Sequence, residues 1–103
     1  MNQTVPRCKI EILLPELLLK RIIGIAESAG ITGYTIIPTL GGAGVGGTWS
    51  DDQLSGAEAR AILIIITSIE KAEALTQALA PLLQSHSLLL TQTSVDVVRG
   101  QKF

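Results

Sequence analysis

The chain has 103 residues, of which 47% are hydrophobic and 17% are charged, and this length predicts one domain over residues 1–103. Its net charge of −1 comes from eight basic and nine acidic residues interspersed along the chain, which excludes a basic surface for a nucleic-acid backbone. A single cysteine, Cys8, excludes an internal disulfide.

The first part of the chain predicts a strand, a helix and a second strand. Polar and apolar residues alternate within 8–14, which is the pattern of a strand with one buried face. Pro15 suits the first turn of a helix, and apolar residues at steps of three and four predict an amphipathic helix over 16–29, ended by Gly30. Residues 34–40 are rich in β-branched side chains and predict the second strand.

This second strand runs directly into a segment, 41–47, that contains five glycines in seven residues. We expect it to continue as a loop to about residue 56, and loops of about 16 residues in small domains are usually functional or disordered. Glycine lets a ligand approach the backbone closely, and successive N–H groups in a bend form a nest for anions, phosphate above all. No Gly-Lys-Ser/Thr follows and the dinucleotide fingerprint fits only loosely, so the alternative to an anion site is a flexible linker.

The second half of the chain predicts a strand, a helix and a final strand. Residues 58–66 end in a continuous aliphatic run, which indicates a strand covered on both faces. Thr67 and Glu70 fit a capping box at the start of a helix that runs to about residue 84, where Pro81 either kinks the last turn or ends the helix early. Residues 88–98 predict the last strand. The inward positions of the second helix are expected to be Ile69, Ala72, Leu75, Leu79, Leu82 and Leu83.

The element order β-α-β-loop-β-α-β predicts an α+β fold, the ferredoxin-like βαββαβ arrangement, in which two helices cover one face of a four-stranded antiparallel sheet. The other face is then bare. Mean hydropathy is +0.43, which is more apolar content than one small core absorbs. The longest apolar run, 61–66, is far shorter than the ~18 residues of a membrane span, and no export signal is recognised. We therefore expect a cytoplasmic oligomer that packs this bare face against copies of itself.

Few side chains suggest catalysis. His86 is the only histidine and is expected in a surface loop, so that no cluster with metal-ligand spacing arises. No Ser–His–acid arrangement can be assembled, and we expect no enzymatic activity. Arg99, just after the last strand, either meets a phosphate bidentately or is a solvated terminal arginine. Trp49 needs a partner surface or a stacking ring, unless it folds back on its own domain.

On this frame, three segments resemble the PII signalling superfamily, and most closely the PII-like proteins associated with bicarbonate transport and carboxysomes. They are SAGITGYT over 28–35, GGAG over 41–44 and SVDVVRGQKF over 94–103, and the resemblance spans residues 9–103. It implies a homotrimer with adenine-nucleotide sites in the three clefts between subunits. It also implies that a segment of about 41–57 is the T-loop, which contacts a partner protein.

The resemblance assigns residues to both roles. The nucleotide-binding positions it implies are Thr35, Gly41, Gly42, Ala43, Gly44, Leu88, Leu89, Arg99 and Gly100. The partner-binding positions are Val45, Gly46, Gly47, Thr48 and Trp49.

Departures from the family pattern indicate which ligand is preferred. Ala43 stands where relatives often carry lysine, and the turn 86–89 lacks the glycine-rich, lysine-bearing sequence of ATP-binding relatives. Each lost cation removes a charge-assisted bond to phosphate of roughly 1.5–3 kcal/mol. We therefore expect AMP, ADP or cyclic AMP to be favoured over ATP. The family context allows bicarbonate as a co-ligand, although no residue of this chain argues for it.

The function predicted is that of a non-catalytic sensor. Nucleotide binding between subunits orders the glycine-rich loop and changes its affinity for a partner, a membrane transporter of bicarbonate or a carboxysome component. Three alternatives stay open: a trimeric metal-binding protein of the copper-tolerance type, a structural trimer without ligand, and an enzyme acting on nucleotides. The scarcity of Cys, His and Met speaks against the metal-binding protein.

Overall fold

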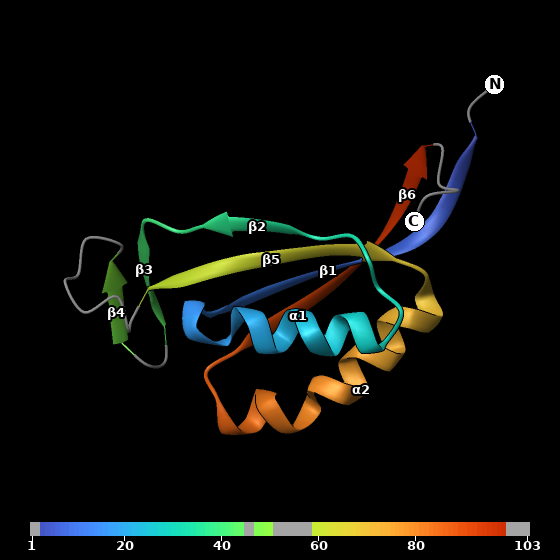
Figure 1. Ribbon diagram of the computed structural model, residues 1–103. Helices are drawn as coiled ribbons and strands as arrows, with labels where there is room; N and C mark the ends of the chain where they lie inside the picture. Colours follow the sequence, from blue (N-terminus) through green and yellow to red (C-terminus); the bar gives the residue numbers. More distant parts are fainter. Residues whose placement is uncertain (1–2, 45–46, 51–58, 99–103) are drawn as a thin grey trace.

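The computed structural model describes residues 3–44, 47–50 and 59–98, which form two layers (Figure 1). The sheet has the strand order β2-β5-β1-β6 with antiparallel neighbours, and α1 and α2 both lie on the same face of it. The predicted α+β, ferredoxin-like fold is confirmed. The elements are β1 (Thr4–Pro15), the 3₁₀ turn η1 (Glu16–Leu18), α1 (Leu19–Ser28), β2 (Thr35–Pro38), β3 (Gly41–Gly44), β4 (Gly47–Ser50), β5 (Arg60–Thr67), α2 (Ile69–Ser85) and β6 (Leu89–Val98).

The core lies between the sheet and the two helices. Every second residue of β1 and β5 points into this core, because successive side chains of a strand point to opposite faces of the sheet. α2 supplies a matching apolar stripe. Ile69, expected inside, is 56% exposed because it lies about 100° around the helix from the centre of this stripe. The fully or nearly buried residues include Ile10, Ile12, Leu14, Ile22, Ala26, Leu63, Ile65, Ala72, Leu75, Leu79 and Leu82.

Both helices differ from the prediction at their ends. The first begins with the 3₁₀ turn η1, so α1 is shorter than the expected 16–29. Pro81 does not end α2, which continues to Ser85. Proline has no N–H to donate to the carbonyl of residue 77, but Gln77 and Pro81 are both exposed, so water can replace that donor. The helix cap is also one residue later than expected, since Thr67 ends β5 and the Ser68 side chain accepts a hydrogen bond from the Lys71 backbone N–H at 3.2 Å.

Replacing Ser68 with alanine is expected to lower the free energy of unfolding by about 1 kcal/mol, because the Lys71 N–H loses its acceptor. Urea denaturation measures this difference. Ser28→Ala is the matched control, since it makes the same chemical change on the exposed last residue of α1. Equal stabilities of the two variants would contradict the assignment of Ser68 as the cap.

The face of the sheet opposite the helices is apolar along β5, while β1 places the Lys9–Glu11 ion pair on it beside Ile64 and Ile66. In β5 it carries Ile62, Ile64 and Ile66, and strand register places Leu13 and Ile37 beside Ile62 on the same face. No described helix covers this surface (Figure 1). We call it the bare face, and its composition agrees with the apolar excess of the sequence.

The segment predicted as one long loop over 41–56 contains two strands instead. β3 and β4 pair as an antiparallel two-stranded sheet, in which Gly42 faces Trp49 and Gly44 faces Gly47. An extended strand is not concave, so residues 41–44 do not form the expected anion nest. The loop prediction is therefore wrong for 41–44 and 47–50, while residues 45–46 and 51–58 lie outside the described residues.

Candidate functional site

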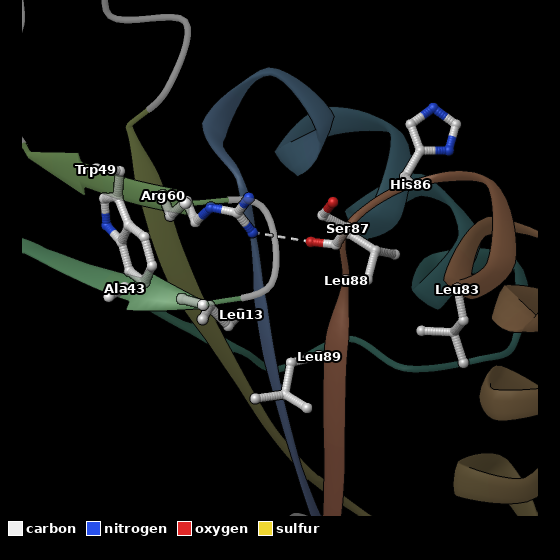
Figure 2. Close-up of a pocket in the computed structure, with 11 residues that line it drawn as sticks. Leu13, Ala43, Trp49, Arg60, Leu83, His86, Ser87, Leu88 and Leu89 are labelled. Atoms are coloured by element: carbon white, nitrogen blue, oxygen red, sulfur yellow. Dashed lines mark hydrogen bonds between the residues drawn. The ribbon is translucent and has the colours of Figure 1, made fainter.

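A cavity of about 370 Å³ lies between the β3–β4 hairpin and the turn that joins α2 to β6 (Figure 2). Leucines from β1, α2 and the start of β6 give it an apolar lining, while Arg60 and Ser87 contribute polar groups. Such a surface suits a ligand with a flat apolar part and an anionic part. The residues that line it are Leu13, Ala43, Gly44, Gly47, Trp49, Arg60, Leu83, His86, Ser87, Leu88 and Leu89.

Glycines 41 and 42 let Trp49 pack closely against β3. A Cβ atom on Gly42 would lie 2.5 Å from Cη2 of the Trp49 ring, which is closer than any real contact. Gly41 has φ +155°, and a Cβ there would lie 2.6 Å from the Trp49 carbonyl oxygen. These two glycines are therefore required by the contact between β3 and β4.

Trp49 folds back on its own chain. Its indole Nε1 donates a hydrogen bond to Thr39 Oγ1 at 3.0 Å, and this hydroxyl donates to the Arg60 carbonyl oxygen at 2.7 Å. The Thr39 backbone N–H also donates to that oxygen, at 3.3 Å. The three contacts hold the hairpin against the first residue of β5, so Trp49 packs on its own chain.

The Arg60 side chain connects the two sides of the cavity. Its guanidinium carbon lies 5.1 Å from the centroid of the Trp49 ring, within the range of a cation–π contact. Its Nη1 donates to the Ser87 carbonyl oxygen at 2.9 Å, as Figure 2 shows. Sequence reasoning missed Arg60, because Ser87 is 27 residues away and no local pattern links them. The one available signal was a cation at the start of a strand that follows the glycine-rich segment.

The structure brings together only some of the predicted site residues. Six of them line the cavity: Ala43, Gly44, Gly47, Trp49, Leu88 and Leu89. Gly41, Gly42 and Thr48 belong to the hairpin but are not among the residues lining this cavity. Thr35 pairs with Ile64 on the bare face and does not line the cavity of its own chain. Val45, Gly46, Arg99 and Gly100 lie outside the described residues.

His86 lines the cavity and is exposed, and its Nδ1 lies 2.8 Å from Ser85 Oγ. Within the described ranges, no group of three His, Cys, Asp or Glu side chains could hold a metal ion. The described helices also include none that is long and apolar enough to cross a bilayer.

Comparison with known proteins gives one family and several similar structures. The model of the family described as Nitrogen regulatory protein P-II matches residues 7–102. CPII from Thiomonas intermedia K12, a nitrogen regulatory PII-like protein bound to ADP, AMP and bicarbonate, superposes with a TM-score of 0.91 and 25% identity, covering 100% of this chain and 98% of CPII. A PII-like signaling protein from Thermus thermophilus superposes with a TM-score of 0.84 and 27% identity, covering 100% of this chain and 99% of that protein.

CutA1 from Oryza sativa is more distant, with a TM-score of 0.60 and 20% identity over 96% of this chain and 86% of CutA1, so it shows likeness of fold alone. No match was found among curated proteins.

Proposed function

The chain belongs to the nitrogen regulatory protein P-II family, and on that premise we propose that it is a PII-like signalling protein that binds AMP or ADP in the cavity between the β3–β4 hairpin and the turn 86–88. The observation that carries this proposal is the match of the whole chain to CPII, whose structure holds ADP, AMP and bicarbonate.

The chemistry of the cavity supports the same ligand class. Leu13, Leu88 and Leu89 offer an apolar surface to a nucleobase, and the Arg60 guanidinium offers a charge-assisted contact to a phosphate. The described residues of the lining include one arginine and no lysine, which favours nucleotides with one or two phosphates over ATP. Bicarbonate, present in the CPII complexes, is proposed as a co-ligand.

The assembly proposed is a homotrimer with the ligand between subunits. The bare face gives each chain a surface, apolar along β5, that copies of the chain can cover. Thr35 lies on this face in the edge strand β2, away from the cavity of its own chain. It can therefore contact a nucleotide only in the cavity of a neighbouring subunit, and binding then depends on assembly.

Signalling is proposed to pass through the segment 41–57, which acts as the T-loop. Ligand binding changes its conformation and thereby its affinity for a partner, which we propose is a bicarbonate transporter or a carboxysome component in the cytoplasm. The partner-binding residues proposed are Val45, Gly46, Gly47, Thr48 and Trp49. In this scheme the protein regulates and does not catalyse.

Isothermal titration is expected to show saturable binding of AMP and ADP, near one nucleotide per chain, with ATP weaker because the lining supplies too few cations for three phosphates. Cyclic AMP is included in the panel, and each titration is repeated with bicarbonate. GTP serves as the control for selectivity of the base. A wild-type protein that binds none of the adenine nucleotides would overturn the proposed function.

A further inference from the structure

Arg60 stands out among the residues that line the cavity because its positive charge has no negative partner in the described part of the chain. The one ion pair found there joins Lys9 and Glu11. The Arg60 guanidinium instead donates to the Ser87 carbonyl oxygen, which is neutral. A guanidinium carries five N–H donors in a planar fork, so donors remain for a second acceptor.

The guanidinium is also held in a defined place. Trp49 lies on one side of it, with 5.1 Å between the ring centroid and the guanidinium carbon. The indole cannot shift freely, because Nε1 is bonded to Thr39 and the ring lies directly over Gly42. A cation that is oriented before a ligand arrives loses little conformational entropy on binding, and this raises affinity and selectivity.

We infer that Arg60 recognises the oxyanion of the ligand in this cavity, and that its contact with Trp49 transmits occupancy to the β3–β4 hairpin. The oxyanion is either a nucleotide phosphate or a bicarbonate bound beside the nucleotide, since both present two oxygens to the fork. The inference rests on the proposed function, because it assigns the anionic part of that ligand. It adds a specificity-determining residue outside the three segments that carry the family resemblance.

The physical basis for transmission is a competition between acceptors. A charged oxygen is a stronger acceptor for guanidinium than a neutral carbonyl, so an anion bound by the remaining donors pulls the guanidinium toward itself and away from the Ser87 carbonyl. Any movement of the guanidinium toward the ligand changes its distance from the indole face, to which it is attracted electrostatically. Because Trp49 belongs to β4, binding of the anion changes the packing of the hairpin. Trp49 is also the only tryptophan, so the protein's tryptophan fluorescence reports on the surroundings of this one indole.

The test compares AMP with adenosine, which differ by the phosphate alone. In the wild-type protein AMP is expected to bind about 10- to 100-fold more tightly than adenosine, because one charge-assisted contact to the phosphate contributes about that factor to the affinity. In Arg60→Gln this ratio should fall to within about threefold of unity, while adenosine affinity stays within about twofold of wild type. Arg60→Lys keeps the charge without the fork and should give an intermediate ratio. Arg21→Gln, an equal change of charge on an exposed residue of α1, should leave the ratio unchanged.

Fluorescence of Trp49 provides the second measurement. Because Trp49 lines the cavity, adenosine serves as the reference for direct contact of the ligand with the indole. AMP should change the emission of the wild-type protein more than adenosine does, and in Arg60→Gln the two saturating ligands should change it equally. Bicarbonate separates the two oxyanion sources: if it is the anion at Arg60, Arg60→Gln loses the effect of bicarbonate on AMP affinity and keeps the AMP-to-adenosine ratio.

The possible failures are distinguishable. If Arg60→Gln keeps both the wild-type ratio of AMP to adenosine affinity and the effect of bicarbonate on AMP affinity, the inference is overturned and the proposed function is left intact. If the wild-type protein binds AMP and adenosine with equal affinity and shows no response to bicarbonate, the inference is also overturned and the proposed function is again left intact. Absence of any nucleotide or nucleoside binding in the wild-type protein would overturn the proposed function itself. Should Arg60→Gln fail to fold, the ratio in Arg60→Lys decides.

Discussion

Ile62→Asp is expected to abolish assembly of the proposed trimer and, with it, the proposed nucleotide binding. Ile62 lies on the bare face, and its neighbours across the two adjacent strands are Leu13 and Ile37. A short carboxylate placed there cannot reach water once another subunit covers the face, and burying an unpaired charge costs several kcal/mol. The symmetry of the assembly repeats this cost in every subunit.

The single chain should tolerate the substitution better than the assembly does, because Ile62 is only half-buried without a partner. Light scattering coupled to size-exclusion chromatography then shows a monomer, and titration with AMP shows no binding. Ile69→Asp is the matched control: Ile69 is 56% exposed at the first position of α2, where an acidic residue is favourable. An Ile62→Asp protein that stays trimeric and binds AMP normally would refute the role given to the bare face.

Gly42→Ala is expected to weaken AMP binding by about 10-fold. The new Cβ would lie 2.5 Å from Trp49 Cη2, so the indole must move away from β3. Movement breaks the hydrogen bond to Thr39 and the contact with Arg60, which together are worth about 1.5–2.5 kcal/mol. Arg60 then loses the support that orients it toward the ligand.

Gly24→Ala in α1 is the matched control, because Gly24 lies outside the residues that line the cavity. A Cβ on Gly24 has no atom within 4 Å outside its own neighbours and helix backbone, so the indole keeps its place. Titration with AMP, and the emission of Trp49 without ligand, should therefore differ between the two variants. Identical behaviour of Gly42→Ala and Gly24→Ala would show that packing of Trp49 on Gly42 has no part in binding.

Residue periodicity was sufficient to predict the framework that supports this site. The alternation in β1, the continuous aliphatic run in β5 and the apolar stripe of α2 predict the sheet and most of the core, because each pattern depends only on local geometry. The glycine content predicts that this segment belongs to the candidate site, and Ala43 and Gly44 line the cavity. The excess of isoleucine and leucine agrees with a bare face opposite the helices.

The β3–β4 hairpin was missed because glycine has a low β-propensity and carries no side-chain pattern. What makes Gly41–Gly44 a strand is the antiparallel partner Gly47–Ser50, and what requires glycine at 42 is the ring of Trp49. The capping residue was misplaced for a related reason. Thr67 and Ser68 both carry a hydroxyl, and the end of β5 at Thr67 leaves Ser68 as the residue that caps α2.

The sequence by itself determined the order of the two helices and of the four strands of the main sheet, the face that α2 turns to the sheet, and the family to which the chain belongs, since these follow from spacing and motifs along the chain. Only the tertiary structure decided the chemistry of the cavity. Arg60, Trp49, Thr39 and Ser87 come from separate segments and meet because β5, the hairpin and the start of β6 converge at one end of the sheet. Contacts across such distances in sequence depend on how the elements pack, and no local pattern encodes them.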